Sequence, residues 1–238
     1  MKISKRRVRR TISYLRWRLT HPLAPYEQYY VHRVLAKIRG GHGHPAIGPS
    51  ARPLRLRSEL LDFLLKFDVK PTDLVIDYGC GSLRLATPLI EFLEPAKYWG
   101  MDLAQEFLDL GLTHLGPQLT EQKRPRLDVI APPVIERARQ EQPRYIISWH
   151  VCSKVPESRF EAYLGNIVRM MSPGAVALIH FPEAEVRRKL TGLAWAVPRS
   201  RFTETLAQLN PAITCEFGSV IEGVVNGIRQ SFAILRHP

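Results

Sequence analysis

Cysteine is scarce in this sequence: the 238 residues include only Cys80, Cys152 and Cys215. The three are odd in number, far apart and without a CxxC pair, so neither a structural zinc site nor a disulfide scaffold is expected. A reducing, cytoplasmic setting is the simplest expectation. His42 and His44 occupy a glycine-rich stretch with no third ligand nearby, so no metal site is predicted there.

Long hydrophobic runs are also missing. No stretch approaches 18 uninterrupted apolar residues, which excludes a transmembrane helix. The basic start of the chain is followed by a segment that Arg16 and Arg18 interrupt, so a cleavable signal peptide is not expected. Hydrophobic residues make up 45% of the chain and charged residues 24%, which excludes fibrous and wholly disordered classes.

Acidic residues are nearly absent from the first quarter of the chain. Residues 1–57 carry 14 Lys or Arg and one acid, Glu27, a net charge of +13, whereas residues 58–238 carry 20 basic and 21 acidic residues, a net charge of −1. The sequence therefore predicts two parts: a basic helical arm and linker (1–57) and a neutral domain (58–238).

The arm is predicted to contain two helices. Val8, Ile12, Leu15 and Leu19 recur at helical spacing among basic residues, which predicts a basic amphipathic helix over 5–20. Such a helix suits an anionic membrane surface, a nucleic acid or a groove on its own domain, and the sequence leaves these three alternatives open. A second helix is predicted over 26–38.

From Ser58 onward, helical patterns alternate with short apolar runs. Ser58 is placed as the N-cap of a helix over 58–67. The expected strands are 74–77, 97–101, 127–130, 144–148 and 175–180, and the expected helices between them are 83–93, 103–112, 133–140 and 157–171. This alternation predicts an α/β fold with a mostly parallel sheet covered on both faces. Apolar runs 219–225 and 228–235 around Asn226-Gly227 predict a closing antiparallel hairpin.

The first of these strands leads through a glycine turn into a helix. Gly79 and Gly81 let the backbone turn sharply and let a ligand approach closely. Asp77 ends the strand, where a carboxylate can accept from an ammonium group, and Asp102 ends the next strand, where an acid can receive both hydroxyls of a ribose. No Walker lysine follows the turn, which excludes a P-loop. Position 84 is Arg rather than the third glycine of GxGxxG, which favours a nucleoside without phosphates over NAD.

The segment Asp77-Tyr78-Gly79-Cys80-Gly81, taken with Asp102, resembles the cofactor signature of class I S-adenosylmethionine-dependent methyltransferases. The resemblance covers residues 74 to about 235. It implies a Rossmann-like sheet of seven mostly parallel strands with a C-terminal antiparallel hairpin, and S-adenosylmethionine as cofactor. It implies a cofactor site that comprises Asp77 near the ammonium group, Gly79, Cys80 and Gly81 at the amino-acid end, Asp102 on the ribose hydroxyls, Leu103 against the adenine, and also Arg84 and Ser148.

Some of these positions depart from the family's pattern or admit two interpretations. Leu83 stands where many members have a further glycine. Arg84 can meet either the cofactor carboxylate or a surface acid. Asp128 is the one candidate for an acid at the adenine amine, and it can instead lie inside a strand.

The loop after the fourth strand adds a candidate catalytic residue. His150 can deprotonate a hydroxyl or amine acceptor, or it can be a packing residue or a cofactor contact. Cys152 in the same loop is more typical of a small buried apolar residue than of a nucleophile. Methyl transfer needs mainly positioning and exclusion of water, so the lack of an obvious base does not exclude an enzyme.

The sequence thus predicts methyl transfer to an oxygen, nitrogen or carbon atom of a small-molecule or lipid-like acceptor. The alternatives are an RNA- or other nucleic-acid-binding protein or methyltransferase that uses the basic arm, and a non-catalytic binding platform with this fold. A cytoplasmic enzyme that the arm holds at the periphery of a membrane is compatible with the first of these.

Overall fold

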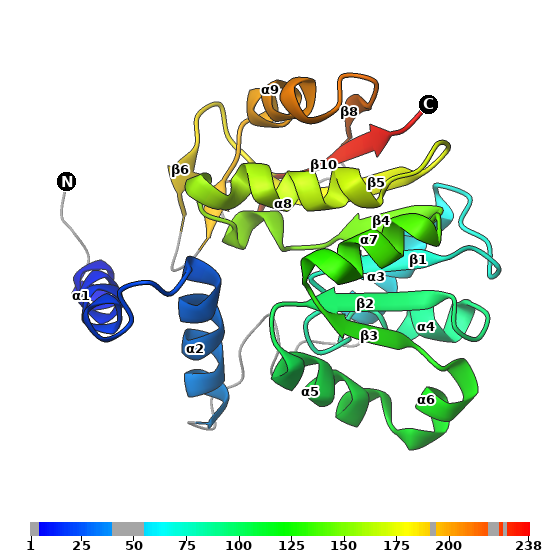
Figure 1. Cartoon of the computed structure of the whole chain (residues 1–238), viewed down its shortest axis with the longest axis horizontal. Helices are drawn as coiled ribbons and strands as arrows, with labels where there is room; N and C mark the ends of the chain where they lie inside the picture. The colour runs from blue at the N-terminus through cyan, green and yellow to red at the C-terminus, as the bar shows by residue number, and fades with distance from the viewer. Residues whose placement is uncertain (1–4, 40–54, 191–193, 219–223, 226–227) are drawn as a thin grey trace.

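A computed structural model describes residues 5–39, 55–190, 194–218, 224–225 and 228–238 (Figure 1). His42 and His44 lie outside these residues. The described helices are α1 (Lys5–Thr20), α2 (Tyr26–Arg39), α3 (Arg55–Leu65), α4 (Thr87–Phe92), α5 (Gln105–Leu115), α6 (Pro117–Lys123), α7 (Pro132–Gln140), the 3-10 helix η1 (Cys152–Lys154), α8 (Glu157–Met170) and α9 (Arg199–Leu209). The described strands are β1 (Val75–Tyr78), β2 (Tyr98–Asp102), β3 (Arg126–Val129), β4 (Tyr145–Ser148), β5 (Val176–Glu183), β6 (Arg188–Lys189), β7 (Trp195–Ala196), β8 (Thr214–Gly218), β9 (Val224–Val225) and β10 (Ile228–Arg236).

The main sheet has the strand order β3-β2-β1-β4-β5-β10-β8 in the described part of the chain, with β9 also paired to β10. The first five strands of this order pair in parallel, and β10 runs antiparallel to both β5 and β8. β6 and β7 form a separate short antiparallel pair. The predicted Rossmann-like sheet, mostly parallel and closed by antiparallel C-terminal strands, is confirmed.

Both faces of the sheet are covered by helices. Val75 and Ile147 belong to a buried cluster with residues of α3 and α4, whereas their neighbours Ile76 and Ile146 belong to a second cluster with residues of α7, α8 and α9. Figure 1 shows α7 and α8 on the viewer's side of the sheet and α3 behind it. Because both faces are buried, the sequences of these strands are continuous apolar runs rather than alternating patterns.

Two predicted helix starts are wrong. The helix predicted over 83–93 begins only at Thr87, because residues 81–86 form turns, and Pro88 lies in its first turn, where its missing N–H costs no hydrogen bond. Ser58 is not an N-cap, since α3 already begins at Arg55 and runs through the boundary predicted between residues 57 and 58.

The closing hairpin forms with a different partner strand over most of its length. On the side away from β5, β10 pairs with β8, a strand that the sequence did not predict. Of the predicted run 219–225, residues 219–223 lie outside the described part, and the described residues form β9, which pairs with β10 through Val225–Ile228 and Val224–Arg229.

The two N-terminal helices form as predicted and lie beside the sheet at one end of the molecule (Figure 1). α2 packs against the start of α5, where Val34 is buried with Ala104 and Phe107. Tyr14 and Trp17 of α1 contact α2, with ring centroids 4.7 and 5.4 Å from that of Tyr29. Within the described ranges, no helix combines the length and the apolar character needed to cross a membrane.

Candidate active site

A cavity of about 700 Å³ lies at the carboxyl ends of β1, β2 and β4. This is the edge at which parallel α/β sheets bind ligands, because loops from neighbouring strands converge there. The cavity brings together most of the site residues predicted from the sequence: Asp77, Gly79, Cys80, Gly81, Arg84, Asp102, Leu103 and His150.

The glycine turn after β1 forms one wall of this cavity. Gly79 and Gly81 adopt φ angles of +95° and +59°, which favour glycine. The backbone N–H groups of Gly79 and Cys80 donate to the Met101 carbonyl at 2.7 and 3.1 Å and thereby fix the turn to the end of β2. A Cβ atom on Gly79 would lie 2.2 Å from Cγ2 of Val151, so the turn and the loop after β4 approach too closely for any side chain.

Asp77 and Asp102 present two buried carboxylates beside the turn. The Tyr98 hydroxyl donates to Oδ2 of Asp77 at 2.9 Å, and the N–H groups of Gly81 and Leu103 donate to the Asp102 carboxylate at 2.6 and 2.7 Å.

The pKa values of both carboxyls depart from their ordinary range. Burial raises the pKa of Asp77 to about 7, with a smaller increase from Asp102, against the lowering effect of the Tyr98 hydrogen bond. Burial also raises the pKa of Asp102 to about 6, against the lowering effect of its two backbone donors. Neither carboxylate pairs with a cationic side chain within the described residues, so this wall is electrostatically suited to a cationic ligand.

His150 lines the cavity from the loop after β4 and is exposed, with φ at +62°. Its ring centroid lies 4.3 Å from that of His180, which is 1% exposed and stacks on Trp149. Neither ring nitrogen of His180 has a hydrogen-bond partner among the described residues. Burial, with a further contribution from His150, holds the pKa of His180 well below its usual range, so His180 is a neutral neighbour of His150.

Ser148 is the one predicted cofactor residue that does not line the cavity. Its buried Oγ donates to the Tyr78 carbonyl at 3.1 Å and lies 2.6 Å from the Tyr163 hydroxyl. Asp128 lies within β3, where it accepts from Nε1 of Trp99 and from Arg137. It therefore does not line the cavity.

Cys152 is fully buried, and burial raises the pKa of its thiol to about 12. A thiol with so high a pKa is not a nucleophile at neutral pH, so the interpretation as a small buried residue is confirmed. Across the described residues, no group of three or more His, Cys, Asp or Glu side chains is arranged to hold a metal ion.

Helix α2 supplies a wall of the cavity that the sequence did not predict. Tyr26, Glu27 and Tyr30 all line the cavity. The Tyr26 hydroxyl is buried and has no hydrogen-bond partner in the described part of the chain, and the Tyr30 phenol lies near enough to Asp102 for that carboxylate to raise its pKa, adding to the larger effect of burial. Arg159 of α8 binds the Glu27 carboxylate at 2.7 Å and joins α2 to the domain. The sequence signal for this wall was the helical spacing of Tyr26, Tyr29 and Tyr30. This spacing predicts a helix but does not show which surface of the domain the helix covers.

Lys154 is a further residue of the cavity that the sequence did not single out. It lies at the end of η1, and burial lowers the pKa of its ammonium group. No acidic side chain among the described residues forms an ion pair with it. The cavity therefore carries a partly buried ammonium group, in addition to Arg84 and Arg159, in the same space as its two buried carboxyls.

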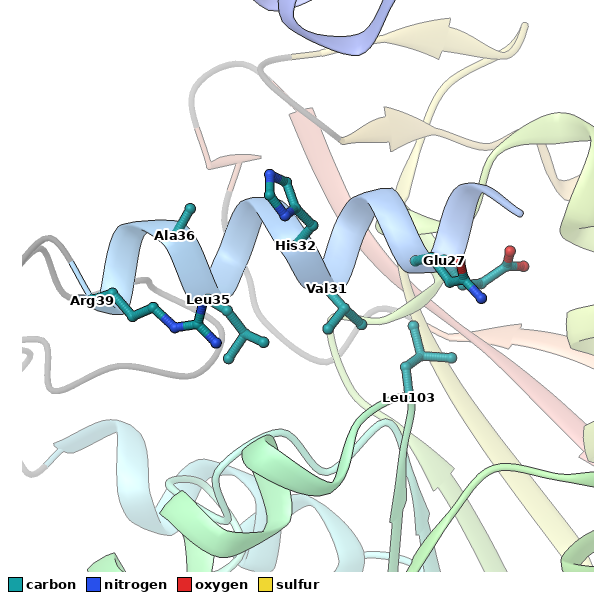
Figure 2. A pocket seen from close by; sticks show the side chains of 8 residues that line it. Glu27, Val31, His32, Leu35, Ala36, Arg39 and Leu103 are labelled. Atoms are coloured by element: carbon teal, nitrogen blue, oxygen red, sulfur yellow. The ribbon is translucent and has the colours of Figure 1, made fainter. Parts of the chain in front are cut away.

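A smaller cavity of about 350 Å³ lies between α2 and the end of β2. Figure 2 shows Val31 pointing from α2 toward Leu103, with Leu35 on the same side of the helix. Glu27 and Leu103 border both cavities.

Comparison with solved structures identifies many proteins with this fold. Magnesium protoporphyrin IX methyltransferase (ChlM) from Synechocystis, solved with bound SAM, matches with a TM-score of 0.58 and 13% identity over 81% of this chain and 88% of that chain. A TehB-like SAM-dependent methyltransferase from Corynebacterium glutamicum matches with a TM-score of 0.52 and 17% identity over 90% of this chain and 98% of that chain. An S-adenosylmethionine-dependent methyltransferase from Clostridium acetobutylicum matches with a TM-score of 0.55 and 10% identity over 89% of this chain and 99% of that chain.

At these identities the solved structures establish the fold alone. Among curated protein sequences, none matches this chain. The family comparison is more specific, because a family described as a methyltransferase domain matches residues 50–210, well over half of the chain. This match includes the glycine turn, both buried aspartates and the loop that carries His150. The chain belongs to this family of methyltransferase domains.

Proposed function

We propose that this protein transfers a methyl group from S-adenosylmethionine (SAM) to an oxygen, nitrogen or carbon atom of a small-molecule or lipid-like acceptor. The observation that carries the proposal is the pair of buried carboxyls, Asp77 and Asp102, beside a glycine turn in one cavity. Bound SAM supplies a methyl group on a sulfonium that is already activated for transfer.

The chemistry of the cavity fits SAM. Asp77 would pair with the ammonium group of the cofactor. The positive charge of that group would lower the pKa of the carboxyl, which burial raises. Asp102 would accept from the ribose hydroxyls. Gly79, Cys80 and Gly81 would lie along the amino-acid end of the cofactor. A Cβ atom on Gly79 would clash with Val151. Arg84 would meet the cofactor carboxylate and Leu103 the adenine, since both line the same cavity.

Ser148 has a different proposed role from the one its position in the sequence suggested. Its hydrogen bonds to the Tyr78 carbonyl and the Tyr163 hydroxyl hold Tyr163 in the wall of the cavity. We therefore assign Ser148 to positioning the wall rather than to direct contact with the cofactor.

His150 is the proposed proton acceptor for a hydroxyl or amine acceptor. It lines the cavity, and an imidazole titrates near neutral pH. The neutral His180 beside it adds no positive charge that would oppose proton uptake. Most of the rate acceleration would come from alignment of the two substrates and exclusion of water.

Two features support a small or lipid-like acceptor. Tyr26, Glu27 and Tyr30 of α2 cover one side of the cavity, so the acceptor must fit beneath this helix. Trp149 and Val155 add apolar surface, and Lys154 offers one ammonium group to an oxygen of the acceptor.

Calorimetry with the full chain tests the proposal. We expect SAM and S-adenosylhomocysteine (SAH) to bind the wild type, and Asp102→Ala to weaken binding by about 1–3 kcal/mol through loss of charged hydrogen bonds. Asp62→Ala, which removes an exposed carboxylate on α3, is the matched control and should leave the dissociation constant unchanged. Absence of binding to the wild type would overturn the function, and an unchanged constant in Asp102→Ala would remove Asp102 from the site.

A further inference from the structure

Helix α1 has two different faces in its described part. Tyr14 and Trp17 pack on Tyr29 of α2, and the Ser13 hydroxyl accepts from Arg33 of α2 at 3.1 Å. Leu15 and Leu19 lie one helical turn apart on another side and are 56% and 82% exposed. Leu23, just beyond the helix, is 95% exposed.

These leucines contradict one expectation for the arm. An amphipathic helix that packs its apolar stripe on its own domain would bury Leu15 and Leu19. In the structure the aromatic residues make the intramolecular contact instead, and the leucines face solvent. Exposed large hydrophobic residues are few elsewhere in the described part of the chain: Leu65, Leu103 and Val186.

The charge around the leucines is strongly positive. The sequence of α1 contains seven Lys or Arg and no acid. The one acid in residues 1–57, Glu27, is bound by Arg159 and so does not neutralise the helix. A basic helix with unpartnered leucines has the chemistry of a segment that lies in the interface of an anionic bilayer.

We propose that α1 docks on an anionic phospholipid surface, with Leu15, Leu19 and Leu23 in the boundary between headgroups and acyl chains and the basic residues at the lipid phosphates. Single-stranded nucleic acid is the less suitable partner, because it is bound by stacking on exposed aromatic rings. The rings of Tyr14 and Trp17 are engaged with α2.

Docking would also place the candidate active site near the lipid. α1 packs on α2 through Tyr29, and α2 lines the cavity with Tyr26 and Tyr30. The docked helix would therefore hold the α2 wall of the cavity at the membrane. The docking itself is independent of the proposed function, but a lipid-like acceptor, which rests on that function, would reach the cavity from this side.

Vesicle flotation with the full chain tests the docking. We expect the wild type to float with phosphatidylcholine vesicles that contain phosphatidylglycerol, less with phosphatidylcholine alone, and less as salt screens the lipid charge. Each leucine that enters the bilayer is worth roughly tenfold in partitioning. The double variant Leu15→Ser, Leu19→Ser removes two such contributions and should therefore lose about a hundredfold in binding. Arg16→Gln should lower only the binding to anionic vesicles.

Leu65→Ser is the matched control, because Leu65 is an exposed leucine on α3, outside the arm. It should float like the wild type, and all variants should bind SAH with the wild-type constant, which separates loss of docking from loss of the proposed function. Three results would overturn the proposal: a wild type that does not float, a double variant that floats normally, or an equal loss in Leu65→Ser. Retention of the full chain on single-stranded RNA without flotation would assign the arm to nucleic acid.

Discussion

Leu83 shows how the turn beside the cavity tolerates an unusual residue. Its backbone has φ at +55°, a region that costs a branched side chain roughly 1–2 kcal/mol, yet the side chain is fully buried. Gly111 of α5 provides the space: a Cβ there would lie 2.7 Å from Cγ of Leu83. The burial of Leu83 is worth about 1.5–3 kcal/mol and can offset the backbone cost. A leucine is therefore compatible with this turn because α5 has a glycine opposite it.

Gly79 has no such compensation, and we expect Gly79→Ala to damage both stability and cofactor binding. The new Cβ would lie 2.2 Å from Cγ2 of Val151, a stiff branched side chain, in addition to the strain of φ at +95°. We expect a loss of about 1–3 kcal/mol beyond the backbone strain, measured by urea unfolding, and a large loss of SAH affinity by calorimetry.

Gly116 provides the control for the backbone alone. It also has a positive φ, +82°, but a Cβ there would meet nothing within 4 Å. Gly116→Ala should cost about 1–3 kcal/mol of stability and leave SAH affinity unchanged. Equal losses of stability in the two variants, with SAH affinity retained in both, would show that Val151 yields easily and that the turn is not a close-fitting wall.

Among the secondary-structure elements, those with strong local signals were predictable from the sequence. The buried runs of β1, β2 and β4 and the pattern of α8 have this character, and the residues at the strand ends followed from them. β8 was missed because Thr214–Gly218 has little apolar character, and its burial is only partial. The role of α2 could not be predicted, because its periodicity shows that a helix forms and not which part of the domain it covers. Tyr26 of α2 was missed for the same reason.

The cover that α2 forms depends on a small contact, so Val34→Ala should loosen it. Val34 is 1% exposed against Ala104 and Phe107, and its truncation should weaken the docking of α2 by about 1–3 kcal/mol. Hydrogen exchange of the α2 amides should accelerate while the exchange of β1 and β4 amides stays the same. SAH affinity should fall as well, because Tyr30 and Glu27 move with the helix.

Gln28→Ala is the control for this helix, since Gln28 is an exposed residue on α2. Its exchange rates should match the wild type. If Val34→Ala left the α2 amides as protected as before, the helix would be held by other contacts, foremost the ion pair of Glu27 with Arg159. An exposed ion pair of this kind is usually worth no more than about 1 kcal/mol, so we expect the Val34 contact to dominate.

At the scale of the whole molecule, charge is distributed unevenly along the chain. The excess positive charge of the sequence belongs to the first 57 residues, while the domain that holds the cavity is nearly neutral. Within that neutral domain, Asp77 and Asp102 are buried without a cationic partner in the described residues, and their pKa values are raised. The folded protein without cofactor therefore carries an electrostatic cost that a cationic ligand would remove.

This cost predicts that Asp77→Asn stabilises the protein without cofactor. A carboxyl whose pKa rises from 3.8 to about 7 on folding contributes stability that is fully present below pH about 4 and is lost as the pH rises through 7. Asparagine does not ionise and can still accept from the Tyr98 hydroxyl. The variant should therefore melt at a higher temperature than the wild type at pH 8, by an amount that shrinks as the pH is lowered toward 4.

The same substitution should weaken SAH binding, because asparagine offers no negative charge to the ammonium group, so stability and function oppose each other at this residue. In the wild type, SAH should bind more tightly as the pH rises through 6 and 7, since binding requires the ionised carboxylate, and this pH dependence should flatten in Asp77→Asn. Asp62→Asn, at an exposed position, should change neither profile. A variant that melts below the wild type at pH 8 but not at pH 5 would mean that Asp77 is stabilised as an anion in the absence of cofactor, and its burial would then impose no electrostatic cost for a cationic ligand to remove.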